Sequence, residues 1–160
     1  MGTRCGDLDP AIVTYLMQRL SLSLEETTSL LNKESGLKGL CGDNDLRLIL
    51  KRANKGDQEA KLALEIFSYR IKKYIGAFAA VLGRLDAVVF TGGIGEHVPY
   101  IRSLVLDDLE NLFGIVIDAD KNNSSEEVIS QPQSRVKLLI IKTDEELQIA
   151  LETSEFLQTP

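Results

Sequence analysis

The chain has 160 residues and a net charge of −6, and it is 44% hydrophobic and 26% charged. This balance is ordinary for one compact globular domain, and the negative charge argues against a nucleic-acid backbone as the main partner. No apolar run approaches the ~20 residues of a membrane span, and the first residues lack the apolar core of a signal peptide. The two cysteines, Cys5 and Cys41, have neither disulfide-framework nor metal-site spacing. We therefore expect a cytoplasmic protein with reduced thiols and no membrane partner.

The first third of the chain predicts helices. Asp9 followed by Pro10 is typical of a helix start, with an N-cap acid and a proline in the first turn. A capping-box pattern begins at Ser23, and Gly36 is expected to end the helix. The expected helices run from about residue 10 to 20, from about 24 to 35, and from 46 to 53.

The strongest helical signal extends from about Asp57 to Leu82. Large apolar side chains recur there at spacings of three and four: Leu64, Phe67, Ile71, Tyr74, Ile75, Phe78 and Leu82. Gly76 interrupts the pattern at a cost of roughly 1 kcal/mol relative to alanine, and Gly83 ends it. A helix with such a face implies a substantial apolar partner surface.

The rest of the chain predicts short strands between helices. Ala87–Phe90 is a continuous apolar run, typical of a strand covered on both faces. Pro99 suits the first turn of a helix with apolar positions as far as Leu112, and Gly114 stops it. A second capping-box pattern, at Thr143, opens a helix to about residue 156. The remaining expectations are a strand at Ile115–Ile117, a polar surface loop at 118–133 and a buried strand at Val136–Ile141.

These elements predict an α/β fold with a thin sheet. Three short strands are a small core for so many helices. The sequence therefore looks like part of a larger domain.

The segment TGGIGE, Thr91 to Glu96, separates the first strand from the next helix. Glycine allows positive φ and lets a ligand approach the backbone, and the helix that follows directs free N–H groups toward it. The usual occupant is a nucleotide phosphate or ribose. Neither the Rossmann nor the P-loop fingerprint is met. We favour nucleotide binding, and a plain structural turn is the alternative.

Three further positions carry candidate chemistry. Arg4 lies between glycines, where a guanidinium can clamp a phosphate or carboxylate; a surface ion pair is the alternative. Taken alone, the pattern at Asp45 and Arg47 predicts a helix N-cap followed by a solvated arginine. Glu145 follows a buried strand, at the end where α/β sheets bind ligands, and helix-dipole stabilisation is its alternative role.

Five segments together carry a family resemblance. They are MGTRCGDLDPAI, KESGLKGL, DNDLR, VVFTGGIGE and KTDEELQIA. In this order and spacing they resemble the C-terminal half of an acetate kinase, with propionate and butyrate kinases as near relatives. The resemblance covers essentially the whole chain, and it implies a partial RNase H-like domain of the sugar kinase and actin-like ATPase superfamily.

The resemblance also implies roles for individual residues. Arg4 matches the arginine that contacts the acyl phosphate or transferring phosphoryl group, and Glu145 matches the acid associated with the catalytic Mg²⁺. Asp45, Leu46 and Arg47 match the segment that lies against adenosine. The nucleotide-binding turn corresponds to Gly92, Gly93, Ile94, Gly95 and Glu96.

The sequence departs from the family pattern at three positions. Leu46 stands where relatives often have Phe or Met, and Leu48 stands where they have an acid. We therefore expect the adenosine contact to differ in detail. His97, the only histidine, replaces a frequent asparagine and takes no role.

The implied reaction is phosphoryl transfer between ATP and acetate or another short-chain carboxylate, giving acetyl phosphate and ADP with Mg²⁺. The implied assembly is a homodimer. The family's N-terminal domain, with an Asn-x-Gly-Ser-Ser-Ser-x-Lys phosphate motif, has no counterpart here. We thus expect residues 1–160 to form a single, incomplete C-terminal domain that is inactive alone. A non-catalytic nucleotide-binding or dimerisation module from a truncated gene is the alternative.

Overall fold

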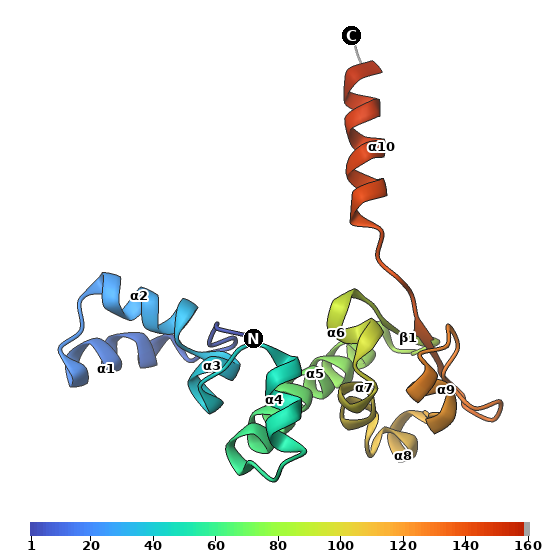
Figure 1. The fold of residues 1–160 in the computed structure, drawn as a ribbon, viewed down its shortest axis with the longest axis horizontal. Helices are drawn as coiled ribbons and strands as arrows, with labels where there is room; N and C mark the ends of the chain where they lie inside the picture. The colour runs from blue at the N-terminus through green and yellow to red at the C-terminus, as the bar shows by residue number, and fades with distance from the viewer. Residues whose placement is uncertain (159–160) are drawn as a thin grey trace. The chain divides into compact units, whose positions relative to one another are not determined.

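A computed structural model describes residues 1–158 (Figure 1). The chain divides into two units, one from Met1 to Lys73 and one from Tyr74 onward. The helices and strands of the described chain are α1 (Pro10–Leu20), α2 (Leu24–Lys33), α3 (Gly36–Cys41), α4 (Leu46–Ala53), α5 (Gln58–Leu82), β1 (Ala87–Phe90), α6 (Gly92–His97), α7 (Pro99–Leu106), α8 (Leu109–Phe113), α9 (Ala119–Ser124), β2 (Lys137–Ile140) and α10 (Glu145–Gln158). The predicted α/β class is confirmed as a mostly helical fold with two parallel strands.

The N-terminal caps form as the sequence predicts. Asp9 accepts a hydrogen bond from the Ala11 N–H, which starts α1. Ser23 and Glu26 form both halves of a capping box at the start of α2. Each cap satisfies N–H groups that a helix leaves without an internal partner.

Gly36 begins a helix, although the sequence predicted that it would end one. Its φ is +61°, and α3 follows directly. The Leu37 and Lys38 N–H groups at the start of α3 donate to the carbonyls of Met1 and Gly2. The N-terminal segment thus supplies the acceptors that allow a new helix to start here.

The core of the first unit lies between α3, α4 and the start of α5. Its buried apolar residues are Leu37, Cys41, Leu46, Ile49, Ala53, Ala60, Ala63 and Leu64. The predicted apolar stripe of α5 is buried at Leu64 but open further along, where Phe78 is 60% exposed. The long helix is therefore confirmed, and its later turns leave large apolar side chains uncovered within the described chain.

In the second unit, β1 and β2 pair in parallel, with Ala87 opposite Lys137 and Phe90 opposite Ile140. The strand predicted at Ile115–Ile117 is wrong: only Ile117 pairs, through an isolated antiparallel bridge to Ser130. The reason is local, because the Val116 N–H donates to the Ser134 hydroxyl and not to a neighbouring strand.

The two strands are less covered than their apolar composition suggested. Val89 is 48% exposed, so the expectation that β1 is buried on both faces is wrong. β2 alternates between exposed Lys137 and buried Leu138 at its start. The described chain supplies two strands and leaves one face of β1 open.

The helix predicted after Pro99 divides in two. α7 ends at Leu106, and Asp108 takes a left-handed conformation before α8. The polar segment 118–133, predicted to be a surface loop, contains α9. The Asp118 carboxylate caps α9 by accepting from the Asp120 and Lys121 N–H groups, and Asn122 is buried within it.

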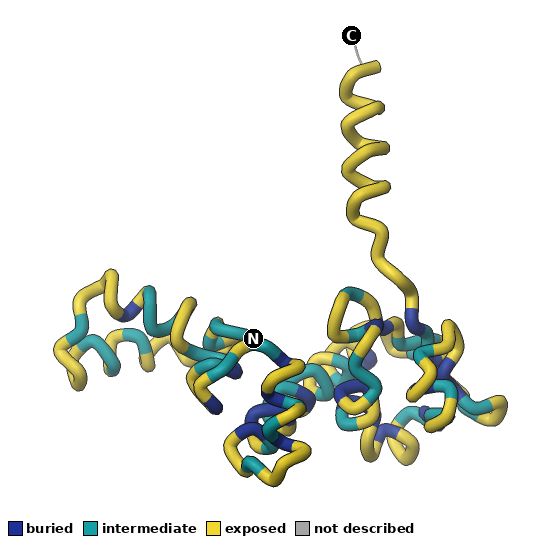
Figure 2. The backbone as a smooth tube through the Cα atoms, in the orientation of Figure 1, coloured by how far each residue is buried: buried dark blue, intermediate teal, exposed yellow. Residues whose placement is uncertain are grey.

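The last helix, α10, forms as predicted, but its capping box does not. Asp144, not Thr143, caps it by accepting from the Leu147 N–H. Every described residue of α10 is exposed (Figure 2). None of the helices within residues 1–158 is long and apolar enough to cross a membrane.

Candidate functional site

The glycine segment after β1 folds as one short helix, α6. Gly92 begins it with a φ of +70°, a conformation that L side chains rarely adopt. Gly95 lies against β1, where a Cβ would come within 3.2 Å of the Phe90 carbonyl carbon. The backbone conformation explains the first of these glycines, and close packing explains the second.

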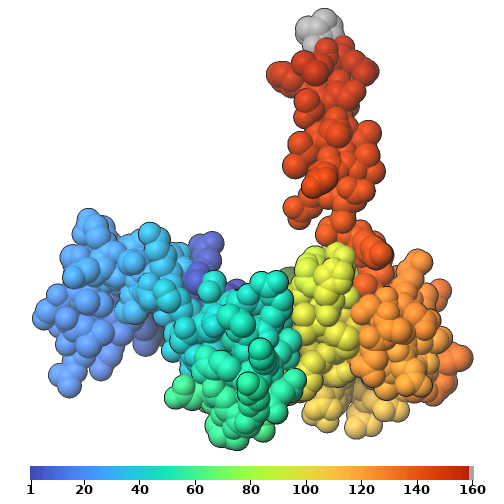
Figure 3. All heavy atoms as spheres, in the orientation of Figure 1, coloured from blue at the N-terminus to red at the C-terminus, as the bar shows by residue number. Residues whose placement is uncertain are grey.

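Gly93 has neither explanation. Its φ is not positive, it is exposed, and a Cβ there would meet no atom within 4 Å. The α6 segment, yellow-green in Figure 3, is open to solvent on the drawn face. The fold of this chain does not require a glycine at this position, and its backbone is free for a ligand to approach.

The Glu96 carboxylate accepts hydrogen bonds from both the start of the glycine turn and the segment after β2. Its Oε1 accepts hydrogen bonds from the Gly92 N–H at 2.9 Å, the Thr143 N–H at 3.0 Å and the Thr143 hydroxyl at 3.1 Å. The Thr143 N–H is the main cause that lowers the Glu96 pKa below its ordinary value, and the Thr143 hydroxyl and the Gly92 N–H add to it against the opposing effect of burial. An ionised, buried carboxylate therefore ties the start of α6 to the segment after β2.

Glu145 lies two residues beyond that tie, at the start of α10. It is exposed, and within the described residues its carboxylate has no hydrogen-bond or ion-pair partner. Residues 1–158 contain no group of three or more His, Cys, Asp or Glu side chains that could hold a metal ion. Glu145 is thus available to a ligand as a single carboxylate, without a prebuilt metal cage around it.

Arg102 is a buried arginine that contacts α6, and it was not predicted from the sequence. It is 0% exposed, and its five N–H groups donate to five acceptors. Two of the acceptors are the Gly95 and Glu96 carbonyls of α6, at 2.7 and 3.0 Å. No local signal in the sequence indicates this role, because position 102 is not among the apolar positions that helical spacing predicts there.

In the first unit, α3 and the end of α2 hold the segment that contains Arg4. The Ser35 N–H donates to the Thr3 carbonyl, and the Cys5 N–H donates to the Leu31 carbonyl. Gly36 allows the close approach, because a Cβ there would lie 2.0 Å from the Met1 carbonyl oxygen. The Arg4 guanidinium itself is exposed and has no partner in the described part of the chain.

The Asp45–Arg47 segment starts α4. Asp45 pairs with the Arg47 guanidinium at 2.6 Å and accepts from the Arg47 N–H at 2.9 Å, and these contacts lower the Asp45 pKa to about 2. The Arg47 side chain is 87% exposed, whereas Leu46 is buried in the core. Gly2 lies beside this segment, since a Cβ there would be 3.8 Å from Asn44 Cβ. The structure therefore brings the Arg4 segment and the Asp45 segment close together.

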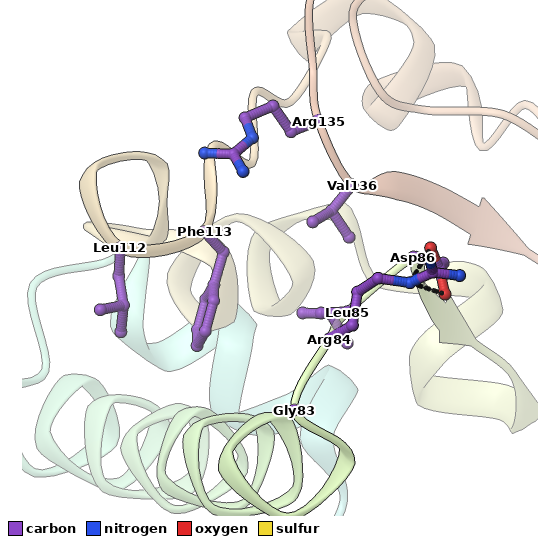
Figure 4. Close-up of a pocket in the computed structure, with 8 residues that line it drawn as sticks. All are labelled: Gly83, Arg84, Leu85, Asp86, Leu112, Phe113, Arg135 and Val136. Carbon is purple, nitrogen blue, oxygen red and sulfur yellow. Dashed lines mark hydrogen bonds and ion pairs between the residues drawn. The ribbon is translucent and has the colours of Figure 1, made fainter.

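Two cavities occur near the sheet of the second unit. One, of about 330 Å³, lies at the amino ends of the strands and is lined by Gly83, Arg84, Leu85, Asp86, Leu112, Phe113, Arg135 and Val136 (Figure 4). The other, of about 220 Å³, lies at the carboxyl end of β2 and is lined by Ser125, Glu127, Ile140, Ile141 and Lys142. Because ligands of parallel α/β sheets bind at the carboxyl ends of strands, the smaller cavity belongs to the end that carries α6 and Glu145.

Comparison with known proteins gives one consistent family. The model of the Acetokinase family matches residues 1–151. An acetate kinase from Helicobacter acinonychis (strain Sheeba) is 53% identical over 99% of this chain. Among solved structures, an acetate kinase from Porphyromonas gingivalis aligns with a TM-score of 0.91, 43% identity and 99% of this chain covered. A propionate kinase from Francisella tularensis subsp. tularensis SCHU S4 aligns with a TM-score of 0.89, 47% identity and 95% covered.

The chain spans only part of these relatives. It covers 40% of the Helicobacter protein, 40% of the Porphyromonas chain and 39% of the Francisella chain. The fold described above is therefore that of a fragment of such a structure.

Proposed function

The chain belongs to the Acetokinase family, and from this premise we propose that it is the C-terminal part of an acetate kinase. In this proposal it supplies one wall of a site that transfers a phosphoryl group between ATP and acetate or another short-chain carboxylate. ATP or ADP binds at α6, and the resemblance in sequence also assigns the start of α4 to the adenosine contact.

Gly93 is the observation that carries the proposal of nucleotide binding. Neither its backbone conformation nor its packing calls for glycine, whereas Gly92 and Gly95 each have a reason within the fold. A ligand that approaches the backbone closely is one physical reason to omit a side chain, and Gly93, unlike Gly76, lies in the turn after β1. The turn also lies at the carboxyl end of β1, where parallel sheets bind nucleotides.

The family resemblance implies roles for the other residues, and their exposure is compatible with those roles. The Arg4 guanidinium is unpaired within residues 1–158 and suits a phosphoryl or carboxylate oxygen. The exposed Arg47 and its partner Asp45 are available to the nucleoside. Leu46 is buried, so its contribution to an adenosine contact falls to its backbone.

Mg²⁺ accompanies ATP in the proposed reaction, where it would neutralise charge on the phosphate oxygens. This ion is commonly bound by one or two carboxylates together with substrate phosphates and waters. The single free carboxylate of Glu145 fits that pattern. Glu96 does not take this role, because its Oε1 already accepts three hydrogen bonds from the protein.

Calorimetric titration of the 160-residue chain with ADP and ATP tests the proposal. We expect weak binding to the wild type and none to Gly93→Val, because the valine side chain fills the space that the nucleotide needs. Gly76→Val is the matched control, since Gly76 is also a helical glycine whose Cβ would meet nothing within 4 Å. Equal heats for the wild type and Gly93→Val would refute the assigned site.

The same preparation tests catalysis. We expect no acetyl phosphate from ATP and acetate, because the phosphate motif of the family's N-terminal domain has no counterpart in this sequence. Nucleotide binding without turnover is the expected result. Turnover by the purified chain would show that this sequence contains a complete site.

A further inference from the structure

Arg102 places a positive charge in the interior without a negative partner. The side chain is fully buried, and its acceptors are the Gly95, Glu96 and Asn122 carbonyls, the Asn122 side-chain oxygen and the Ser125 hydroxyl. None of these is a carboxylate. Burying a charge without an opposite charge is costly, and an apolar side chain of similar volume commonly stabilises a core better. Stability alone therefore does not account for an arginine at this position.

The geometry of the five bonds suggests another purpose. Two carbonyls lie near the C-terminal end of α6, and one lies within α9. The Arg102 guanidinium thus connects α6 and α9, two short helices about 20 residues or more apart in sequence. Asn122 strengthens the connection, because its amide donates to the Pro99 carbonyl and the Ser103 hydroxyl on the same helix as Arg102.

α6 depends on such external contacts for its orientation. It has six residues, three of them glycine, and a helix of that length is not stable by itself. The Glu96 carboxylate holds its first residue, Gly92, and Arg102 holds the carbonyls of Gly95 and Glu96. Two partners outside α6 therefore fix it: Thr143 through the Glu96 carboxylate, which also binds Gly92, and Arg102 through the carbonyls near its C-terminal end.

We propose that Arg102 is a positioning residue for the nucleotide turn: its guanidinium fixes α6 in the orientation that presents the open backbone of Gly93 to the ligand. It acts through the Gly95 and Glu96 carbonyls and does not touch the nucleotide. The link to nucleotide affinity rests on the proposed function, whereas the effect on the orientation of α6 does not.

The test uses the 160-residue chain with Arg102→Met, which keeps the length of the side chain but removes all five donors, and Arg102→Lys, which keeps the charge. Ile129→Val is the matched control, because Ile129 is also 0% exposed and contributes only apolar packing. Ser125→Ala removes a single acceptor of Arg102 and provides a milder variant if Arg102→Met does not fold.

Two measurements are made on each variant. Calorimetry with ADP is expected to show affinity at least about tenfold weaker for Arg102→Met, the scale of one lost hydrogen bond to a charged group, with partial rescue in Arg102→Lys. The amide resonances of Gly93 and Gly95 are expected to shift in both variants and, to a smaller extent, in Ser125→Ala. Ile129→Val is expected to leave the affinity and these resonances unchanged, whatever it does to the melting temperature.

The outcomes separate the inference from the proposed function. Wild-type affinity and unshifted glycine resonances in Arg102→Met, or in Ser125→Ala if Arg102→Met does not fold, would overturn the inference, as would equal shifts in Ile129→Val. If the wild type binds no ADP, the proposed function fails, and hydrogen exchange of the Gly95 to His97 amides then decides the inference. Faster exchange in Arg102→Lys than in Ile129→Val supports a positioning role, and equal rates contradict it.

Discussion

Glu96 shows how one side chain can hold a flexible segment in place. A single carboxylate oxygen accepts from Gly92, at the start of α6, and from both the backbone and the hydroxyl of Thr143. Hydrogen bonds to a charged acceptor are stronger than those between neutral groups, and a glycine-rich turn loses much conformational entropy when it is ordered. The acid therefore offsets part of the cost of the glycines beside it.

The stability that Glu96 contributes is expected to depend on pH. Its pKa is lowered in the folded state, chiefly by the Thr143 N–H, so the fold favours the ionised form. Its contribution is thus fully present above the ordinary glutamate pKa of about 4.3 and is lost as pH falls through the lower folded-state pKa. We expect Glu96→Gln to be less stable than the wild type at pH 7, with the difference shrinking in acid.

Urea denaturation of both proteins between pH 3 and pH 7 measures this difference. A Glu25→Gln variant is the control, because Glu25 is exposed and caps nothing in the described chain. A Glu96→Gln difference that stays constant across the range would contradict the role of the ionised carboxylate.

At the scale of elements, two of the motifs in the sequence form a single structure. The segment that contains Arg4 and the segment that contains Gly36 are about 30 residues apart, yet backbone hydrogen bonds join them along α3. Gly36 makes this possible in two ways, since its φ is +61° and a Cβ would overlap the Met1 carbonyl. Its importance is therefore for the placement of Arg4, and not for the end of the preceding helix.

A comparison of two glycines tests that explanation. Gly36→Ala is expected to destabilise the chain through both backbone strain, about 1–2 kcal/mol, and overlap, about 1–3 kcal/mol. Gly42→Ala is the matched control, because Gly42 also has positive φ, +78°, but its Cβ would meet nothing within 4 Å. Gly42→Ala should therefore lose only the roughly 1–2 kcal/mol that the backbone strain costs, which is one part of the loss expected for Gly36→Ala. Free energies of unfolding from urea titration measure both, and equal losses would indicate that the contact with Met1 does not matter.

The comparison of sequence and structure shows which elements local patterns can predict. The bounds of α4 and β1 agree with the prediction because capping, spacing and glycine stops are all local signals. α9 was missed because its polar composition resembles a loop, although the Asp118 cap and the buried Asn122 stabilise a helix.

The same limit applies to the candidate site. The glycine turn and the exposed Arg4 were found from sequence alone, although their roles remain proposals. The failed capping box at Thr143 and the role of Arg102 could not be read, because their partners lie 47 and 20 residues away. Contacts of that range leave no periodic signal in one sequence.

For the whole molecule, the exposed apolar surface is the most informative feature. On the later turns of α5, Phe78, Val81 and Leu82 are 60%, 83% and 67% exposed. On α10, Leu147, Ile149, Leu151, Phe156 and Leu157 are all more than half exposed. Surfaces of this kind are uncommon on monomers, and the chain covers only about 40% of its relatives, so some of this surface is available to residues that these relatives have beyond the aligned part.

We expect the chain to self-associate through α5, as a two-fold dimer in which each helix contributes the same residues. Burying one large apolar side chain stabilises the dimer by roughly 1.5–3 kcal/mol. In an isologous interface each substitution is present on both subunits, so its effect occurs twice. Phe78→Asp should therefore weaken the dimer by at least about tenfold, since 1.4 kcal/mol corresponds to a factor of ten.

Phe156→Asp is the matched control, because Phe156 is a phenylalanine of α10 with 79% exposure. Light scattering over a range of micromolar concentrations distinguishes the two variants. A monomeric wild type that unfolds cooperatively would refute the dimer, and a dimer disrupted only by Phe156→Asp would move the interface from α5 to α10.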